Sequence, residues 1–206
     1  MKSKLKNIKG FTLVELLVSV GIFALMTALL MTRYGNFNQG ILLNNLAYDI
    51  ALNIRSAQSY GLNVKSAPGA AANFSNDFRY PFGVEFESNS DVFILFADIN
   101  SNGFFDDGLG AILTTRKIKN IASIDSLCVT NTGSCSTTVS TLTISFRRPD
   151  PNAIIRGDAG TTNMNMAEIT VKSTDGSKKK IVVRSNGQIG VENVTIQAAQ
   201  QAQQQN

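Results

Sequence analysis

The sequence predicts an α+β fold, in which a long N-terminal helix, transmembrane at first and then amphipathic, packs on a C-terminal antiparallel β-domain. Three observations predict this class: an apolar run from Phe11 to Met31, an apolar stripe at helical spacing after it, and short aromatic and β-branched segments beyond residue 80. The 206 residues suffice for one compact domain with an appendage.

Within the N-terminal stretch KNIKGFTLVELLVSVGIFALMTALLM, residues 6–31, the run from Phe11 to Met31 is long and apolar enough to cross a membrane as a helix. Four lysines precede this run and only Arg33 follows it closely, which favours a cytoplasmic N-terminus and an exported body. A secretory signal peptide would have a shorter apolar region and a cleavage site after it. A simple signal anchor is the other alternative, but it gives no reason for Glu15, since a mid-membrane carboxylate costs from about 2.5 kcal/mol upward.

The positive charge of the chain comes from the same end. The formal net charge is +4, from 19 basic and 15 acidic residues. Four of the basic residues and none of the acidic ones lie in residues 1–10, so the remainder carries 15 of each sign. The basic balance is therefore no evidence for a body that binds nucleic acid.

The stretch KGFTLVELLVSVGIFAL resembles the class III signal of type IV pilins and type II secretion pseudopilins. In that family a basic leader ends in Gly, Phe usually follows, and Glu stands four positions further on; Gly10, Phe11 and Glu15 match. The resemblance implies that a membrane prepilin peptidase cuts between Gly10 and Phe11 and then methylates the amine of Phe11. It also implies a single-pass inner-membrane protein with a periplasmic or extracellular head, which an inner-membrane assembly platform moves from lipid into a filament of similar subunits.

Within such a filament, the resemblance implies that Glu15 pairs with the Phe11 amine of a neighbouring subunit. A buried charge is tolerable beside an opposite charge and costly without one, so Glu15 would set the register of assembly. Its spacing also allows a pair with its own terminus, and the remaining alternative is a side chain that reaches the lipid headgroups.

The helix is expected to continue to about Gly61, with one apolar face that packs on a sheet. The apolar face comprises Leu43, Leu46, Ile50, Ile54 and Ala57, and the opposite face carries Asn45, Asp49, Asn53 and Ser56. The segment IRSAQSYGLNV is similar to the H-type pseudopilin and FimT minor pilin branch. The expected parts are a cleaved leader at 1–10, a transmembrane helix at 11–32, its amphipathic continuation at 33–64, a β-rich head at 65–196 and a Gln-rich disordered tail at 197–206.

Strands are predicted in seven segments of the head, and Ala-rich residues 66–77 are predicted as a loop. The segments are FGVEFES, DVFILFAD, AILTTRKI, TLTISFRR, AEITVKS, KKIVVRS and QIGVENV. Asp175-Gly176 and Asn186-Gly187 predict tight hairpin turns between the last three.

The loop DINSNGFFDDG has the spacing of the front half of a calcium loop, with Gly103 at the turn. The candidate oxygen ligands are Asp98, Asn100, Asn102 and Asp106. Leu109 stands where a bidentate Glu is expected, and the flanking segments are predicted strands. We therefore favour an Asx-stabilised turn without metal, with calcium as the alternative, and expect no other cofactor.

Cys128 and Cys135 flank a short loop, which predicts a structural disulfide in an exported domain. The chain has no His, no Cys-x-x-Cys and no phosphate-binding Gly loop, so we expect a substrate of enzymes rather than an enzyme. The leading interpretation is a minor pilin or secretion pseudopilin. The alternative is a DNA-binding minor pilin for natural transformation, with Arg147, Arg148, Lys178, Lys179 and Lys180 as candidate contacts.

Overall fold

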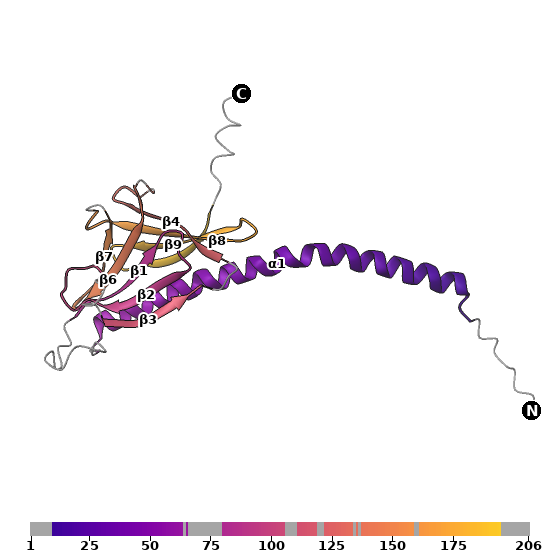
Figure 1. Cartoon of the computed structure of the whole chain (residues 1–206), viewed down its shortest axis with the longest axis horizontal. Helices are drawn as coiled ribbons and strands as arrows, with labels where there is room; N and C mark the ends of the chain where they lie inside the picture. The colour runs from indigo at the N-terminus through magenta and orange to yellow at the C-terminus, as the bar shows by residue number, and fades with distance from the viewer. Residues whose placement is uncertain are drawn as a thin grey trace, which may run out of the picture. The chain divides into compact units, whose positions relative to one another are not determined.

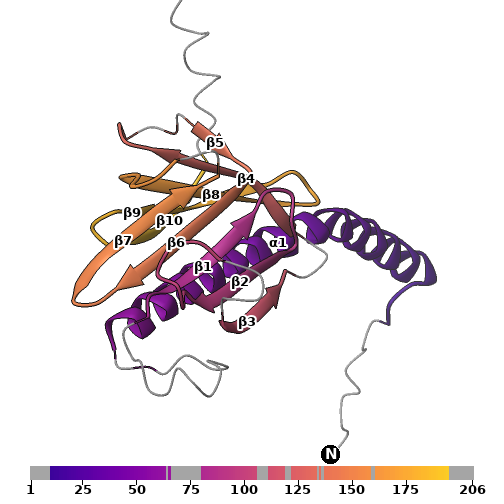
Figure 2. The ribbon, with the colours of Figure 1, turned by 60° about the vertical axis from the view of Figure 1, so that its left-hand side comes forward.

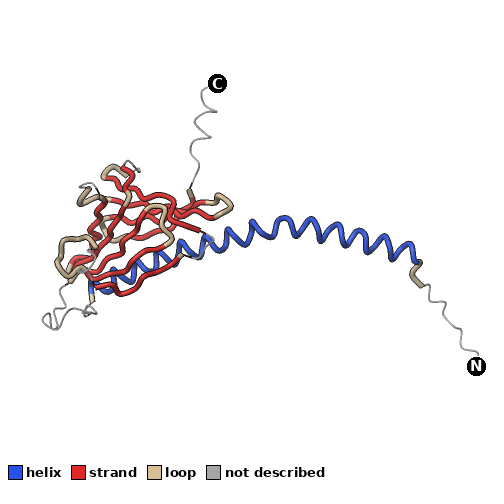
Figure 3. The backbone as a smooth tube through the Cα atoms, in the orientation of Figure 1, coloured by secondary structure: helices blue, strands red, loops and turns tan. Residues whose placement is uncertain are grey.

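The computed structural model describes residues 10–63, 65, 80–105, 111–118, 122–133, 135, 137–158 and 161–194 (Figure 1). These residues form one α-helix and ten β-strands (Figure 3). By its internal contacts the chain divides into two compact units, Met1–Asn38 and Gln39–Asn206. Most of the predicted leader, the predicted loop at 66–77 and the predicted tail at 197–206 lie outside the described residues.

Helix α1 comprises Leu13–Leu62 and is the only helix in the described part of the chain. It ends one residue beyond the predicted Gly61. Within the second unit its buried face carries Leu43, Ala47, Ile50, Ala51, Ile54 and Ala57. The prediction that Asn53 lies on the face opposite the packed one is wrong. Its side chain is only 7% exposed, and it is accommodated because its Nδ2 donates a 2.8 Å hydrogen bond to the Asp49 carbonyl one turn earlier.

The second unit contains two five-stranded antiparallel sheets, which confirms the predicted α+β class (Figure 2). Sheet A has the order β3-β2-β1-β6-β7, and sheet B has the order β10-β9-β8-β4-β5. Sheet A is formed by β1 (Phe82–Glu87), β2 (Val92–Ala97), β3 (Ala111–Lys117), β6 (Thr141–Arg147) and β7 (Asp150–Gly157). Sheet B is formed by β4 (Ala122–Thr130), β5 (Thr137–Val139), β8 (Met166–Ser173), β9 (Lys178–Arg184) and β10 (Ile189–Asn193).

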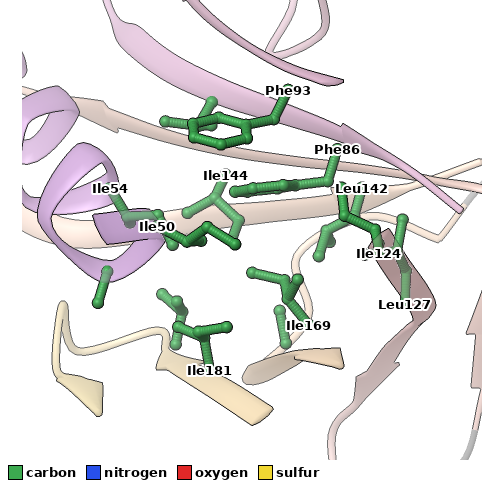
Figure 4. Close-up of a cluster of buried hydrophobic side chains, with 14 of the residues drawn as sticks. Ile50, Ile54, Phe86, Phe93, Ile124, Leu127, Leu142, Ile144, Ile169 and Ile181 are labelled. Carbon is green, nitrogen blue, oxygen red and sulfur yellow. The ribbon is translucent and has the colours of Figure 1, made fainter. Parts of the chain in front are cut away.

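The second half of α1 completes a core between the two sheets. Ile50 and Ile54 of the helix are fully buried. They meet Phe86 and Phe93 of sheet A on one side and residues of sheet B such as Ile181 on the other (Figure 4). Fully burying an aliphatic or aromatic side chain stabilises a fold by about 1.5–3 kcal/mol, so this three-sided core holds the helix against both sheets.

Three strands were not predicted from the sequence, namely β4, β5 and β7. The alternation of β4 is interrupted by a register shift between Ile124 and Ser126. Strand β5 has only three residues, and β7 begins with Asp150-Pro151, a pair typical of turns. Both β5 and β7 are edge strands, where short length and proline are tolerated.

Candidate functional site

The Gly10–Phe11 peptide bond lies in an exposed, non-helical segment ahead of α1. The Phe11 side chain is 78% exposed. Nothing lies within 4 Å of the position that a side chain at Gly10 would occupy. The predicted cleavage junction is therefore accessible to a peptidase. Residues 1–9 lie outside the described part of the chain.

Thr12 caps the helix directly after this junction. Its Oγ1 accepts a hydrogen bond of 3.3 Å from the Glu15 backbone N–H, and its carbonyl accepts one of 3.1 Å from Leu16 N–H. Thr at the N-cap followed by Glu three residues later is the capping-box pattern. The sequence contains this signal in the letters TLVE, but our sequence interpretation did not use it.

The segment Leu13–Met31 is long and apolar enough, by length and composition, to cross a membrane. It has 19 residues with a mean hydropathy of 2.4, and none of it is buried. At 1.5 Å per helical residue it is about 28 Å long, close to the thickness of a bilayer hydrocarbon core. These features are consistent with a single-pass, membrane-anchored protein.

Three polar side chains occur within this segment, and two of them are satisfied by the helix itself. Ser19 Oγ donates to the Glu15 carbonyl at 2.7 Å, and Thr27 Oγ1 donates to the Phe23 carbonyl at 2.8 Å. The Glu15 carboxylate has no hydrogen-bond or ion-pair partner among the described residues. Because Glu15 lies in the first turn, the helix dipole favours its negative charge, but no cationic side chain in the described part of the chain pairs with it.

The predicted disulfide between Cys128 and Cys135 is present, with the two Cα atoms 5.9 Å apart. Cys128 lies on β4 and is 5% exposed, whereas Cys135 is exposed. The bond closes the hairpin between β4 and β5.

The Asp98 loop folds over the outer face of sheet A as a series of Asx turns. Asp98 is 2% exposed, and its carboxylate accepts hydrogen bonds from the N–H groups of Asn102 at 3.2 Å and Gly103 at 2.7 Å. Asn100 Oδ1 also accepts a hydrogen bond from Asn102 N–H, and Asn102 Oδ1 accepts one from Phe104 N–H. The Arg156 guanidinium of β7 donates to the Asn102 carbonyl.

Three of the four predicted calcium ligands, Asp98, Asn100 and Asn102, therefore lie in one compact loop. The fourth, Asp106, lies outside the described residues. The described residues hold no group of three or more His, Cys, Asp or Glu side chains placed to bind a metal ion. The Asx turns are those of the favoured interpretation, and calcium binding at this loop stays the alternative.

The two predicted basic clusters lie apart: one is at the start of β9, and the other is in the β6–β7 turn, near the end of β9. Lys178 opens β9, while the turn after Arg184 lies beside β7, where Ser185 O accepts from Ala153 N–H. Arg147 and Arg148 belong to the β6–β7 turn at that second end.

Two of the three lysines at the first end are paired. Lys178 forms an ion pair with Asp125 at 2.6 Å, and Lys180 lies 3.3 Å from Glu168 and 3.5 Å from Glu192. The structure thus gives these clusters no common basic surface.

Comparison with known proteins points to the N-terminal segment alone. Residues 5–31 match the family model described as the prokaryotic N-terminal methylation motif. No curated protein and no solved structure matches the chain. Proteins with this type of motif are structural rather than catalytic. The motif, the exposed Gly10–Phe11 bond and the apolar helix behind it indicate a type IV pilin-like substrate of prepilin peptidase.

Proposed function

We propose that this chain is a structural subunit of a type IV pilus-like filament, either a minor pilin or a type II secretion pseudopilin. Prepilin peptidase cuts the Gly10–Phe11 bond at the cytoplasmic face and methylates the amine of Phe11. The helix then anchors the subunit in the inner membrane with the head on the outer side, until the assembly platform moves it into a filament of like subunits.

The observation that supports this proposal is the unmatched carboxylate of Glu15. The two hydroxyls of the Leu13–Met31 segment are satisfied within the helix, but Glu15 has no partner among the described residues. A charged group in hydrocarbon gains stability from an opposite charge brought to it. Cleavage at Gly10–Phe11 creates such a charge on every subunit, four residues from Glu15.

The Phe11 amine and the Glu15 carboxylate then form an ion pair between neighbouring subunits. The amine of one Phe11 meets the carboxylate of the next subunit's Glu15, and helix packing supplies the remaining contacts. The lone helix carries an uncompensated acid and the packed helices do not, so the pair favours assembly in one register.

Mass spectrometry and assembly of Glu15 variants test the proposal. The mature protein should begin at a methylated Phe11, and an intact leader or a cut after residue 31 would reject it. Glu15→Leu should insert in the membrane and be processed but fail to enter filaments. Ser19→Leu is the matched control, since it removes a polar group one turn further on that the helix already satisfies, and it should assemble normally. Equal assembly of both variants would reject the role of Glu15.

A deletion phenotype decides between a minor pilin and a secretion pseudopilin. A secretion pseudopilin should be needed for export of folded proteins and dispensable for surface pili, and a minor pilin should show the reverse. A deletion strain scored for both properties, and complemented with the wild-type chain, distinguishes them.

A further inference from the structure

Strand β4 has one edge paired with β8 and a second edge that is covered by two short pieces of chain. One piece is the β1–β2 turn, where Asn89 N–H donates to the Ile124 carbonyl at 2.9 Å and Ile124 N–H donates to the Ser90 carbonyl at 3.0 Å. The other piece is β5, which pairs with only three residues of β4, Leu127, Cys128 and Val129. Where β5 pairs with it, β5 is the outermost strand of sheet B.

The disulfide holds the outer part of β5 in place. Val139, the last residue of β5, is 4% exposed and packs against Gly157, so it is anchored by the core. Thr137 and Thr138 are exposed and contribute nothing to the core. They pair with Val129 and Cys128 of β4, and the bond from Cys135, two residues before Thr137, to Cys128 holds this short pairing together.

A second contact docks the same hairpin. Asn165 N–H donates to Asn131 Oδ1 at 2.9 Å, and Asn165 Nδ2 donates to the Asn131 carbonyl at 3.2 Å. This contact fixes the start of the loop after β4 but not its return along β5. The return segment therefore depends on the disulfide.

The β4 edge under β5 is suited to pair with another strand. Its three residues are uncharged and contain no proline, and Leu127 and Val129 are fully buried. An exposed edge of this kind pairs readily with a strand from another chain unless it is covered. A like edge on a second copy offers the same row of N–H and C=O groups, and two such edges can pair antiparallel about a two-fold axis.

We propose that the redox state of the Cys128–Cys135 disulfide controls whether β5 covers the β4 edge. When oxidised, it keeps β5 on β4. When reduced, it releases the segment before Val139, and the edge at Cys128 and Val129 then pairs with the same edge of a second copy.

A dithiol reductant reduces this disulfide by attacking its exposed sulfur, that of Cys135. One thiolate of the dithiol attacks Cys135 Sγ, the disulfide breaks, and Cys128 leaves as a thiolate and takes up a proton. The second thiol of the reductant displaces Cys135, which also ends as a thiol. The reductant becomes a cyclic disulfide, so two electrons and two protons pass to the protein.

Hydrogen–deuterium exchange of the full chain in detergent micelles, with and without dithiothreitol, tests the proposal. Reduction should raise exchange in the peptides covering Cys128–Val129 and Thr137–Thr138 by up to about 60-fold, since opening an eight-residue loop restores that much conformational freedom. Exchange at Ile124 should not change, because the β1–β2 turn covers the same edge there without any disulfide. A rise at Ile124 as well would indicate general unfolding and reject the proposal. No rise in any of these peptides would also reject it.

Self-association tests the second half of the proposal. The particle mass in micelles should increase on reduction and return on reoxidation, and Cys128→Ser/Cys135→Ser should behave as reduced without any reductant. Faster exchange at β5 without a change in mass would reject pairing between copies. This test does not depend on processing at Gly10–Phe11, so its result is separate from that of the proposed function.

Discussion

The side-chain amide of Gln58 on α1 donates a 3.2 Å hydrogen bond to the carbonyl of Gly187 in the β9–β10 turn. The same Nε2 donates at 3.3 Å to the Pro151 carbonyl at the start of β7. One helix side chain therefore ties both sheets at the turn that Asn186-Gly187 predicted. Gly187 has a φ of +83°, and a Cβ there would lie 2.5 Å from the Pro151 oxygen.

Gly187→Ala should accordingly destabilise the head far more than Gly176→Ala. Both glycines have positive φ, which costs an alanine about 1–2 kcal/mol. A Cβ at Gly176 meets nothing within 4 Å, whereas one at Gly187 meets backbone, which adds about 1–3 kcal/mol of overpacking. Thermal unfolding of both variants, followed by circular dichroism, measures the difference. Equal losses would contradict the close approach at Gly187.

Gln39→Ala should loosen the start of the helical segment in the head. Gln39 Oε1 accepts hydrogen bonds of 3.1 Å from Ser173 Oγ, Thr174 Oγ1 and Asp175 N–H. Its removal deletes these hydrogen bonds, and a typical intramolecular hydrogen bond contributes about 0.5–1.5 kcal/mol to stability. Hydrogen exchange should rise in residues 40–47. Gln39→Glu keeps an acceptor oxygen and is the control, and it should retain most of the protection.

The Asp175 carboxyl should titrate below its ordinary range. The backbone hydrogen bond from Ser177 N–H, 2.8 Å long, lowers the pKa of Asp175 below its usual value of 3.8. Because the unfolded chain takes up the proton first, this contribution to stability is present above pH 3.8 and is lost as the pH falls through the lowered pKa. A carboxyl carbon NMR titration gives the midpoint, and a value at or above 3.8 would contradict the turn geometry.

Asp175→Asn is the matched variant for that titration. Asn186 holds the equivalent place in the next turn, where its Oδ1 accepts from Gln188 N–H at 3.0 Å without a titrating group. We expect Asp175→Asn to keep the turn and to remove its share of the acid sensitivity.

Thr12→Ala should fray the first turn of α1. The variant loses the side-chain acceptor for Glu15 N–H, and loss of an N-cap costs about 1 kcal/mol. Amide exchange at Val14–Leu16 in micelles should rise. Thr27→Ala removes a hydroxyl that serves only its own helix, so its effect on that turn should be nil.

Asp98→Ala should cost the head about 2–3 kcal/mol, because it leaves the buried N–H of Gly103 and the part-buried N–H of Asn102 without their carboxylate acceptor. Asn100→Ala should cost less, since Asn102 N–H keeps Asp98 as an acceptor. Urea unfolding of both variants, with and without millimolar calcium, also tests metal binding. A calcium-dependent gain in wild type that Asp98→Ala lacks would support the calcium alternative over the favoured metal-free turn.

Sequence reasoning located the elements whose pattern is local. The apolar run at the N-terminus, the helical stripe around Ile50 and the turns at Gly176 and Gly187 each depend on a few neighbouring residues, and each is present in the structure. The disulfide followed in the same way from two cysteines at the ends of one short loop.

The elements that sequence reasoning missed depend on residues distant in the chain. Strand β7 tolerates its proline because it lies at an edge, and that edge is defined only by the assembled sheet. Asn53 is buried because of the packing of α1 against the sheets, which its polar side chain does not reveal. Arg156 meets Asn102 only when the Asp98 loop folds across sheet A.

The chain visits the two sheets alternately, with β1–β3 in sheet A, β4–β5 in sheet B, β6–β7 in sheet A and β8–β10 in sheet B. Neither layer can thus be completed from one contiguous stretch of polypeptide. Ile181, Val183 and Ile189, which close the core around the helix, belong to the last two strands. In the orientation that we propose, a head crossing the membrane from its N-terminal end therefore lacks its final core partners until almost the whole polypeptide has emerged. Any truncation ahead of β9 should leave a head that cannot fold.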